Sequence, residues 1–430
     1  MNVAYKPNIR GSATLCAGSY GAVTEAKTVV IDGATVDGVV SGTDQLDLTL
    51  LSGSVESLAT AATAVKHVKI NISGGRIEKL TLRGVTDSLA LLYYGGVIAS
   101  ATAEGTNVPG TLTLGDRMAA SDLGNAASLF TKRGERVVYA SDGATGNGYS
   151  PASPASFRAA YELLRNGGTL VVVVEVTSSD TFYKAPLHSG RITLTSVYDG
   201  VDYRKSADAR FVLTRSFYFS GDTEVDHLSI VSAGSYAGFF CCYHDVTFGS
   251  DVVCGIAAEN TTYPCIITGA KGDIANQSGT VVIHGGDWQR LRLGNSGDNP
   301  TNVTTSVVMN GGTIHEYVIM VTTSHRSHVG SGSFVLNGGT VKGNVYGAYY
   351  STASTIFKGD LSVVLGGGTV HGGVYATKNG TGVLSGSFTV TVKGGDLSQI
   401  PEIVGTNTET FKSKLISETA LPATVKVSGF

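Results

Sequence analysis

The sequence predicts an all-β chain, a parallel β-helix solenoid with one short capping α-helix. Two observations lead to this fold class. Glycine-marked segments recur at nearly constant spacing, and the residues between them alternate like strands, with almost no helical pattern. Repeats of about 20–50 residues indicate solenoids or related arrays. A single short repeat cannot bury its own inner face, so we expect stacked coils that share one continuous core.

The repeat is clearest in the C-terminal half, in the segments VVIHGGDW, VVMNGGTI, FVLNGGTV and VVLGGGTV. The first glycines of these and of one further corner lie 26, 27, 29 and 27 residues apart: Gly285, Gly311, Gly338, Gly367 and Gly394. We expect glycines at this fixed place in each coil to supply positive φ for the corner between two strands. Asn310 and Asn337 should tolerate similar geometry. The threonines that follow the glycines should stack as a hydroxyl ladder: Thr313, Thr340 and Thr369.

A looser version of the repeat lies near the N-terminus, at IDGATV, LSGSVESL and SGGRIEKL. Its markers Gly33, Gly53 and Gly74 are 20 and 21 residues apart. We therefore expect two domains. Residues 1–130 should form a short β-helical or β-rich module, and residues 131–430 the main parallel β-helix, with regular coils at about 280–400.

One segment, SPASFRAAYELLRNGG, breaks the strand pattern. Its apolar residues follow helical spacing: Phe157, Ala160, Tyr161 and Leu164. Ser153 is suited to the N-cap and Pro154 to the first turn. We expect a helix at about 154–165 that covers one open end of the main solenoid, where unpaired strand edges would otherwise be exposed.

Composition disfavours several classes of binding partner and site. Only 15% of the 430 residues are charged and the net charge is −3, which disfavours a nucleic-acid surface. No apolar run reaches 18 residues, so membrane insertion is not expected. Five cysteines without C-x-x-C spacing favour buried thiols over a zinc site or a disulfide framework. One disulfide, between Cys254 and Cys265, stays open as an alternative.

The order VVYASDGATGNGYSPASPASFRAAYELLRNGGTLVVVVEVT, HSGRITLTS and then the GG-T coils resembles the right-handed parallel β-helix (pectin-lyase-like) superfamily. More narrowly, it is similar to Gly-rich repeat regions of secreted bacterial surface proteins. The resemblance covers about residues 135–400, and residues 28–100 more weakly. It implies a right-handed solenoid but selects no single function, because members include polysaccharide lyases, glycoside hydrolases, adhesins and phage tailspikes. The N-T-D, D-D, G-H-G and R-I-K motifs of polygalacturonases and the R-x-P-x-x-R motif of pectate lyases are missing.

The richest polar cluster lies on the first regular coils, at DWQRLR and IHEY. If the coils stack in register, Asp287 lies over Thr313 and Arg290 over Glu316. An exposed tryptophan beside these groups would form a sugar platform. The candidate ligand-binding residues are therefore Trp288, Arg290, Arg292 and Tyr317. The candidate catalytic groups are Asp287 and Glu316 here, with His325 and His328 in a following loop.

The alternative to this interpretation is that Trp288 is a core or edge residue and that Arg290 and Glu316 form a surface ion pair.

The sequence contains only one weak candidate for a calcium site. The segment NSGDNPTN could offer Asn295, Asp298 and Asn302 to calcium, but calcium sites usually collect several carboxylates. We expect no metal and no other cofactor, with calcium the one alternative.

Two His-Asp neighbours, at EVDHL and YHDVTF, are further polar candidates. Adjacent residues on a strand point to opposite faces, so neither pair is expected to act as a dyad.

These features favour an extracellular or surface-displayed module that binds a polysaccharide or surface glycan, or is adhesive or structural, rather than a catalyst. A polysaccharide-degrading lyase or glycoside hydrolase is one alternative, and a phage tailspike or fibre protein of a virion is another. The first residues, MNVAYKPNIRG, lack the pattern of a secretory signal, which fits either a mature segment or a protein that stays where it is made. Self-association through an open end of the solenoid stays an alternative.

Overall fold

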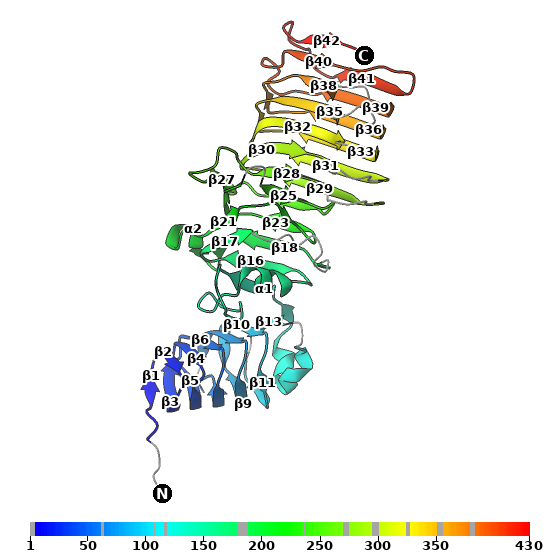
Figure 1. Cartoon of the computed structure of the whole chain (residues 1–430). Coiled ribbons are helices and arrows are strands. Elements are labelled where there is room, and N and C mark those ends of the chain that lie inside the picture. Colours follow the sequence, from blue (N-terminus) through cyan, green and yellow to red (C-terminus); the bar gives the residue numbers. More distant parts are fainter. Residues whose placement is uncertain are drawn as a thin grey trace. The chain divides into compact units, whose positions relative to one another are not determined.

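A computed structural model describes residues 5–61, 64–106, 108–115, 118–178, 188–234, 237–269, 275–294, 301–323, 327–350, 356–378 and 383–430. The chain divides into two compact units, Met1–Val137 and Val138–Phe430, which Figure 1 colours from blue to cyan and from green to red. The expected boundary at 130/131 falls a few residues before this division. Both units are solenoids of parallel strands, with about 14 turns in total, which confirms the predicted all-β fold class.

The N-terminal unit is a two-sheet solenoid whose first eleven strands alternate between the sheets. Branched apolar residues stack in register from coil to coil, and Val29, Leu48 and Ile70 form one such buried column. The first sheet contains β1 (Ile9–Arg10), β3 (Ser19–Ala26), β5 (Thr35–Ser41), β7 (Ser54–Ala59), β9 (Arg76–Arg83), β11 (Val97–Ile98) and β12 (Ala101–Glu104). The second contains β2 (Ala13–Cys16), β4 (Thr28–Asp32), β6 (Gln45–Leu50), β8 (Val65–Ile72), β10 (Val85–Tyr93), β13 (Thr111–Leu114) and β14 (Lys132–Arg133).

A 3-10 helix that the sequence pattern does not predict lies near the end of this unit. This helix, η1 (Ala120–Leu129), buries Leu123 and Ala126. Leu123 joins the same core cluster as Leu112 of β13. The polar stretch at the end of the N-terminal module therefore contains apolar residues that close its core.

The C-terminal unit is built from three parallel sheets. Sheet 1 contains β15 (Val137–Ala140), β16 (Gly168–Val172), β18 (Ile192–Thr195), β23 (Thr223–Val225), β26 (Val246–Phe248), β29 (Ser278–Ile283), β31 (Val303–Met309), β33 (Ser327–Leu336), β36 (Ile356–Leu365), β39 (Val383–Val392) and β41 (Phe411–Ser417). Sheet 2 contains β17 (Glu175–Ser178), β21 (Arg210–Leu213), β24 (Ser229–Ser232) and β27 (Val253–Ile256). Sheet 3 contains β22 (Phe217–Tyr218), β25 (Gly238–Phe240), β28 (Cys265–Ile267), β30 (Asp287–Arg292), β32 (Thr313–Thr323), β34 (Thr340–Val341), β35 (Asn344–Tyr350), β37 (Thr369–Val370), β38 (Val374–Lys378), β40 (Glu402–Val404) and β42 (Lys426–Ser428).

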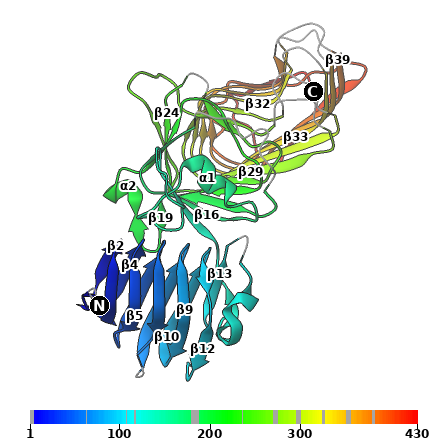
Figure 2. The same cartoon turned by 60° about the horizontal axis from the view of Figure 1, so that its bottom comes forward.

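The early coils of this unit have three walls, and the later coils have sheets 1 and 3 as their long walls, with β33 and β32 on opposite sides in Figure 2. The register along sheet 1 reproduces the predicted intervals. It joins the last inward residues of successive strands: Ile283, Met309, Leu336, Leu365 and Val392. All five are buried, so the apolar residue before each corner is the part of the repeat that builds the core.

The two glycines of each corner have different tasks. The expected positive φ is present at every corner and falls on the second glycine, as at Gly312 (φ 81°). The first glycine is needed for close approach, because a Cβ at Gly311 would lie 2.2 Å from the carbonyl oxygen of His284 in the preceding coil. Asn310 does not adopt positive φ. Instead, Nδ2 of Asn337 donates to Oδ1 of Asn310 at 3.0 Å, which links two coils.

The threonines after the glycines stack in register, as expected. Their contacts to the preceding coil run through the backbone: the Thr340 N–H donates to the Gly312 carbonyl at 3.0 Å and the Thr369 N–H to the Gly339 carbonyl at 2.9 Å.

The predicted capping helix is present but shorter, as α1 (Phe157–Glu162). Its N-cap is Ser156, whose side chain accepts from the Ala159 N–H, so the expected cap at Ser153 is wrong. The ring of Phe157 packs edge-on against Phe211 of sheet 2, with 5.1 Å between centroids. In Figure 2, α1 lies across the N-terminal end of the coils, and its residues Phe157, Ala160 and Tyr161 are buried in the core. A second short helix, α2 (Tyr203–Ser206), follows the antiparallel pair β19 (Val197–Tyr198) and β20 (Val201–Asp202), and neither was expected.

All five cysteines are free thiols, so the alternative of a disulfide between Cys254 and Cys265 is not realised. Both of these side chains are buried, as is that of Cys241. Burial raises the pKa of the Cys265 thiol, which keeps it in the protonated form. These cysteines serve as small core residues.

Candidate functional site

Trp288 lies inside the core and not on the surface. Its side chain is 0% exposed, its ring packs on Phe248 with 4.7 Å between centroids, and Nε1 donates to the Gly285 carbonyl at 3.0 Å. The expectation of an exposed sugar platform at Trp288 is therefore wrong, and its alternative, a core residue, holds.

The neighbours of Trp288 on β30 form the start of a polar surface. Asp287 pairs with Thr313 as expected, but the register then shifts between Trp288 and Arg290, so that Arg290 pairs with Tyr317. The guanidinium of Arg290 nevertheless reaches the Glu316 carboxylate through Nε and Nη2, the latter at 3.0 Å. The expected contact therefore exists, although the expected register does not.

Glu316 is held as a carboxylate by its donors. Besides Arg290, the side-chain amide of Gln289 donates to Glu316 Oε1 at 2.8 Å. Hydrogen bonding from Arg290 is the largest influence that keeps the pKa of Glu316 below its ordinary value, and it outweighs partial burial. The group is ionised at neutral pH and is not suited to donate a proton.

Tyr317 lies beneath two guanidinium groups. Arg290 and Arg292 place their central carbons 5.3 and 6.0 Å from the Tyr317 ring centroid. Nη2 of Arg292 also donates to the Tyr317 hydroxyl at 3.0 Å. Cations over aromatic faces attract the ring electrons, so these contacts fix the two arginines against the sheet.

His315 connects Asp287 to the next coil. Its Nε2 lies 2.8 Å from Asp287 Oδ1, and its Nδ1 lies 3.3 Å from Nζ of Lys342. Because an ammonium group can only donate, Nδ1 accepts and the Nε2–H donates to Asp287. The ring of Tyr263 stacks on His315 with 4.2 Å between centroids.

The same side of sheet 3 carries further tyrosines that the sequence analysis missed. Tyr346 and Tyr375 are in register and stack at 5.4 Å, and Nζ of Lys378 lies 4.8 Å from the Tyr346 centroid. The Tyr375 hydroxyl donates to Glu402 at 2.9 Å, and burial, before this contact, raises the pKa of Tyr375 to about 12. The recurring strings NVYG and GVYA after the corner were the available signal.

We call this surface the polar face of sheet 3. It is made of Asp287, Arg290, Arg292, His315, Glu316, Tyr317, Lys342, Tyr346, Tyr375, Lys378 and Glu402. Along it, side chains from consecutive coils contact one another, while Val318, Val345 and Val374 of the same strands are buried in the core.

The remaining catalytic candidates do not join this face. His328 is 3% exposed, with its ring near Phe357, so the expectation of a loop residue is wrong there. Burial lowers the pKa of His328 to about 4, and its Nδ1 has no hydrogen-bond partner among the described residues. His325 lies outside the described residues.

The calcium candidate can be followed only at its last residue, because Asn295 and Asp298 also lie outside the described residues. Nδ2 of Asn302 donates to Oδ1 of Asn276 at 2.7 Å, which joins two coils.

Sheet 1 carries a second candidate surface. A hollow of about 260 Å³ is lined mainly by serine and threonine residues, and its lining includes Thr304, Ser331, Ser333, Asp360, Ser387 and Thr389. Ser387 Oγ donates to Asp360 at 2.6 Å, and the hydroxyl oxygens of Ser306 and Ser333 are 2.7 Å apart. Some of these hydroxyl groups therefore already form hydrogen bonds between neighbouring coils.

Among the helices of the described residues, none is long and apolar enough to cross a bilayer. No protein-family model matches the chain, and neither the curated proteins nor the solved structures contain a match to it. The parallel β-solenoid is thus established by the coils themselves, whereas the likeness to the pectin-lyase-like superfamily rests on the sequence pattern.

Proposed function

We propose that the C-terminal unit is an extracellular or surface-displayed module that binds a glycan on the polar face of sheet 3. The observation that carries this proposal is the gathering of arginine, lysine, carboxylate and tyrosine side chains from consecutive coils on one side of one sheet. Guanidinium, carboxylate and phenol groups can bond to sugar hydroxyls, and aromatic rings offer an apolar surface beside them.

The shape of the face favours a chain-like ligand. Neighbouring parallel strands lie about 4.8 Å apart, so an extended polymer along the stack would meet a new set of side chains at each coil. Arg292 and Tyr317 are already held by each other, through a hydrogen bond and a guanidinium over the ring. Such preorganised groups lose little conformational freedom on binding, which favours affinity.

The available cations favour an acidic glycan. Arg290 is paired with the Glu316 carboxylate, whereas Arg292 and Lys378 contact tyrosine side chains. A sugar carboxylate or sulfate could use such donors in a charge-assisted hydrogen bond.

The carboxylates favour binding over hydrolysis. Most glycosidases need one carboxyl group whose pKa is raised so that it can donate a proton. The pKa of Glu316 is lowered instead, and Asp287 is occupied by His315. A polysaccharide-degrading enzyme and a virion fibre are the two alternatives, and each predicts a different experimental result.

The test combines a glycan array with a reducing-end assay on the same acidic polysaccharides. We expect the wild type to bind uronate-rich or sulfated chains and release no new ends. Arg292→Ala and Tyr317→Ala should bind at least about tenfold more weakly, which is about 1.4 kcal/mol. Tyr5→Ala is the matched control, because Tyr5 is 88% exposed and belongs to the other unit.

Equal binding by all variants would remove the polar face of sheet 3 from the proposal. Release of reducing ends would establish the enzyme alternative. Mass measurement in solution addresses the fibre alternative, for which a detergent-resistant trimer is expected, while a monomer would count against it.

A further inference from the structure

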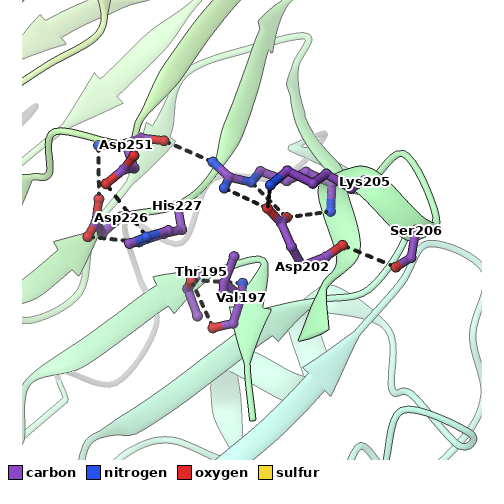
Figure 3. Close-up of polar contacts among 9 residues, drawn as sticks. Thr195, Val197, Asp202, Lys205, Ser206, Asp226, His227 and Asp251 are labelled. Carbon is purple, nitrogen blue, oxygen red and sulfur yellow. Dashed lines mark hydrogen bonds and ion pairs between the residues drawn. The ribbon is translucent and has the colours of Figure 1, made fainter. Parts of the chain in front are cut away.

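A cluster of metal-ligating side chains lies at the corner between sheets 1 and 2. Asp226 and His227 directly follow β23, and Asp251 comes from the next coil, between β26 and β27. Figure 3 shows the three side chains turned toward one another. One donor atom from each residue lies within 4.8 Å of the other two.

The orientation of His227 is the central observation. Its Nδ1 lies 3.0 Å from Asp226 Oδ2, and its Nε2 faces Asp251 Oδ2 at 3.6 Å. Both partners are carboxylates, which only accept, while a neutral imidazole has a single N–H. Nδ1, at hydrogen-bonding distance, takes that proton. Nε2 then presents a lone pair to a carboxylate oxygen of Asp251. Because two electron-rich atoms repel each other, a cation between them would stabilise this arrangement.

The local backbone explains why neighbouring residues meet here. In a regular strand, Asp226 and His227 would point to opposite faces, as expected from the sequence. His227 instead has left-handed φ (48°), just past the end of β23, and this turns its ring back over Asp226. The Asp251 N–H donates to Asp226 Oδ1 at 3.3 Å, which joins the two coils.

We propose that this corner binds a divalent transition-metal ion of the zinc class between Nε2 of His227 and the carboxylate of Asp251. A separation of 3.6 Å is too long for a hydrogen bond. It is close to the spacing of about 3.3 Å between two ligands of a tetrahedral ion with bonds of about 2.0–2.1 Å. Asp226 then acts as a positioning residue, because a carboxylate on the far imidazole nitrogen commonly fixes the tautomer of a metal-bound histidine.

The ligand types favour zinc-like ions over calcium. Calcium collects about six to eight oxygen ligands, whereas imidazole nitrogen suits zinc, cobalt and nickel. With two protein ligands, the remaining positions are open to water or to a ligand oxygen. An open position is the arrangement that lets a metal contact a second molecule.

The guanidinium of Arg204 also lies at this corner, but its main partner is the Asp202 carboxylate. Arg204 donates from Nη1 to the backbone carbonyl of Asp251 at 3.0 Å, while its Nε and Nη2 contact Asp202 at 3.0 and 2.9 Å. Hydrogen bonding from Arg204 lowers the pKa of Asp202 to about 2, so this carboxylate is ionised and balances the guanidinium. Lys205 also pairs with Asp202, at 3.5 Å. The Arg204 guanidinium also interacts electrostatically with Asp251 and Asp226, after Asp202. In formal charge, Arg204 and Lys205 face the three carboxylates of Asp202, Asp226 and Asp251, which leaves one negative charge for an ion.

The test uses Co²⁺ and Zn²⁺ with the tag-free full chain at pH 7.5, read by the visible absorption of Co²⁺ and by calorimetry. We expect one ion per chain, with a spectrum of a low-coordinate site. His227→Gln and Asp251→Asn should weaken binding at least about tenfold. Asp226→Asn should weaken it about 10–100-fold, as removal of a positioning carboxylate does. Far-UV circular dichroism reports whether each variant is folded.

His315→Gln is the matched control, since His315 also contacts an aspartate but has Lys342 on its other nitrogen. It should bind Co²⁺ like the wild type. The proposal is overturned if the wild type binds neither ion below about millimolar concentration, which would leave a proton as the positive species. It is also overturned if folded His227→Gln keeps the wild-type spectrum. Neither result depends on glycan binding.

Discussion

Replacement of Trp288 by alanine tests how the first regular coil is held. The indole is fully buried between two aromatic neighbours, with centroids 4.7 Å from Phe248 and 6.4 Å from Phe239. Its Nε1 satisfies the carbonyl of Gly285 at the corner. The substitution removes both the packing and the hydrogen bond, so its cost can be estimated from these two parts.

The packing loss dominates. Large aromatic-to-alanine changes in cores cost about 3–5 kcal/mol, because the surrounding chain only partly fills the cavity. Trp288→Phe separates the two parts, since it retains most of the apolar volume and leaves the Gly285 carbonyl without its donor, at about 1–3 kcal/mol. Tyr317→Ala on the next coil removes surface cation–π contacts and should cost about 1 kcal/mol. Total stabilities are about 5–15 kcal/mol, so the alanine variant loses a large share.

The assay is urea unfolding followed by far-UV circular dichroism, with midpoints and slopes compared because solenoids can unfold in parts. Trp288 is the only tryptophan of the chain, so its fluorescence gives a second readout in the wild type. We expect blue-shifted emission that iodide does not quench and that added glycan does not change. The reasoning is refuted if Trp288→Ala stays within about 0.5 kcal/mol of the wild type, or if iodide quenches the native emission as it quenches a free indole.

Three further predictions concern the corner, the core and the polar face. In Gly312→Ala, the alanine would have to adopt φ of 81°, and its Cβ would lie 2.6 Å from a backbone oxygen. We therefore expect the free energy of unfolding, measured by thermal melts, to fall by at least about 2 kcal/mol. Gly255→Ala, whose Cβ would meet nothing within 3.7 Å, should melt like the wild type. Because burial holds the pKa of His328 at about 4, against about 6.5 when unfolded, the unfolded chain binds more protons between these values. Stability should fall by about 3 kcal/mol from pH 7 to pH 4, and His328→Leu should flatten this dependence in urea midpoints. Glu316→Gln should cost about 1 kcal/mol at pH 7, and this difference should vanish as pH falls through the lowered pKa of Glu316, when midpoints of the two proteins are compared.

The coil repeat could be predicted because the same physical requirement recurs at every turn. Each coil needs inward branched residues and a corner free of Cβ contacts, and both leave marks at fixed spacing. The predicted intervals between Gly285, Gly311 and Gly338 are those of the observed register between Ile283, Met309 and Leu336. A one-residue slip would turn the buried residues outward, which is why register follows the pattern closely.

The orientation of Trp288 was also readable, but only by comparing coils. The residue after the Asp or Thr of each corner is Trp288, Ile314, Val341 or Val370, and all four are buried. Residue type alone suggested a ligand platform, whereas the column of equivalent positions indicates the core. Trp288 is thus the largest side chain in a column of buried apolar residues.

Two features of the candidate sites have no comparable signal. The register shift in front of Arg290 depends on a local irregularity between β30 and β32, and nothing in a periodic pattern marks it. The left-handed backbone of His227 is uncommon for a residue other than glycine, so the meeting of His227 with Asp226 and Asp251 could not be expected. Sequence periodicity describes what all coils share, and these sites arise where single coils depart from it.

Side chains of the polar face contribute much less to the free energy of unfolding than side chains of the core. The glycan proposal can therefore be tested by mutation. Exposed ion pairs contribute about 0–1 kcal/mol, against about 3–5 kcal/mol for a buried tryptophan. Removing Arg292 or Tyr317 therefore costs little of the stability that the stacked core supplies, although these side chains would supply much of the contact to a ligand. Loss of binding in a variant that melts like the wild type then reports on the polar face of sheet 3 itself. Loss that follows the melting temperature would instead mean that the surface acts only by supporting the coils.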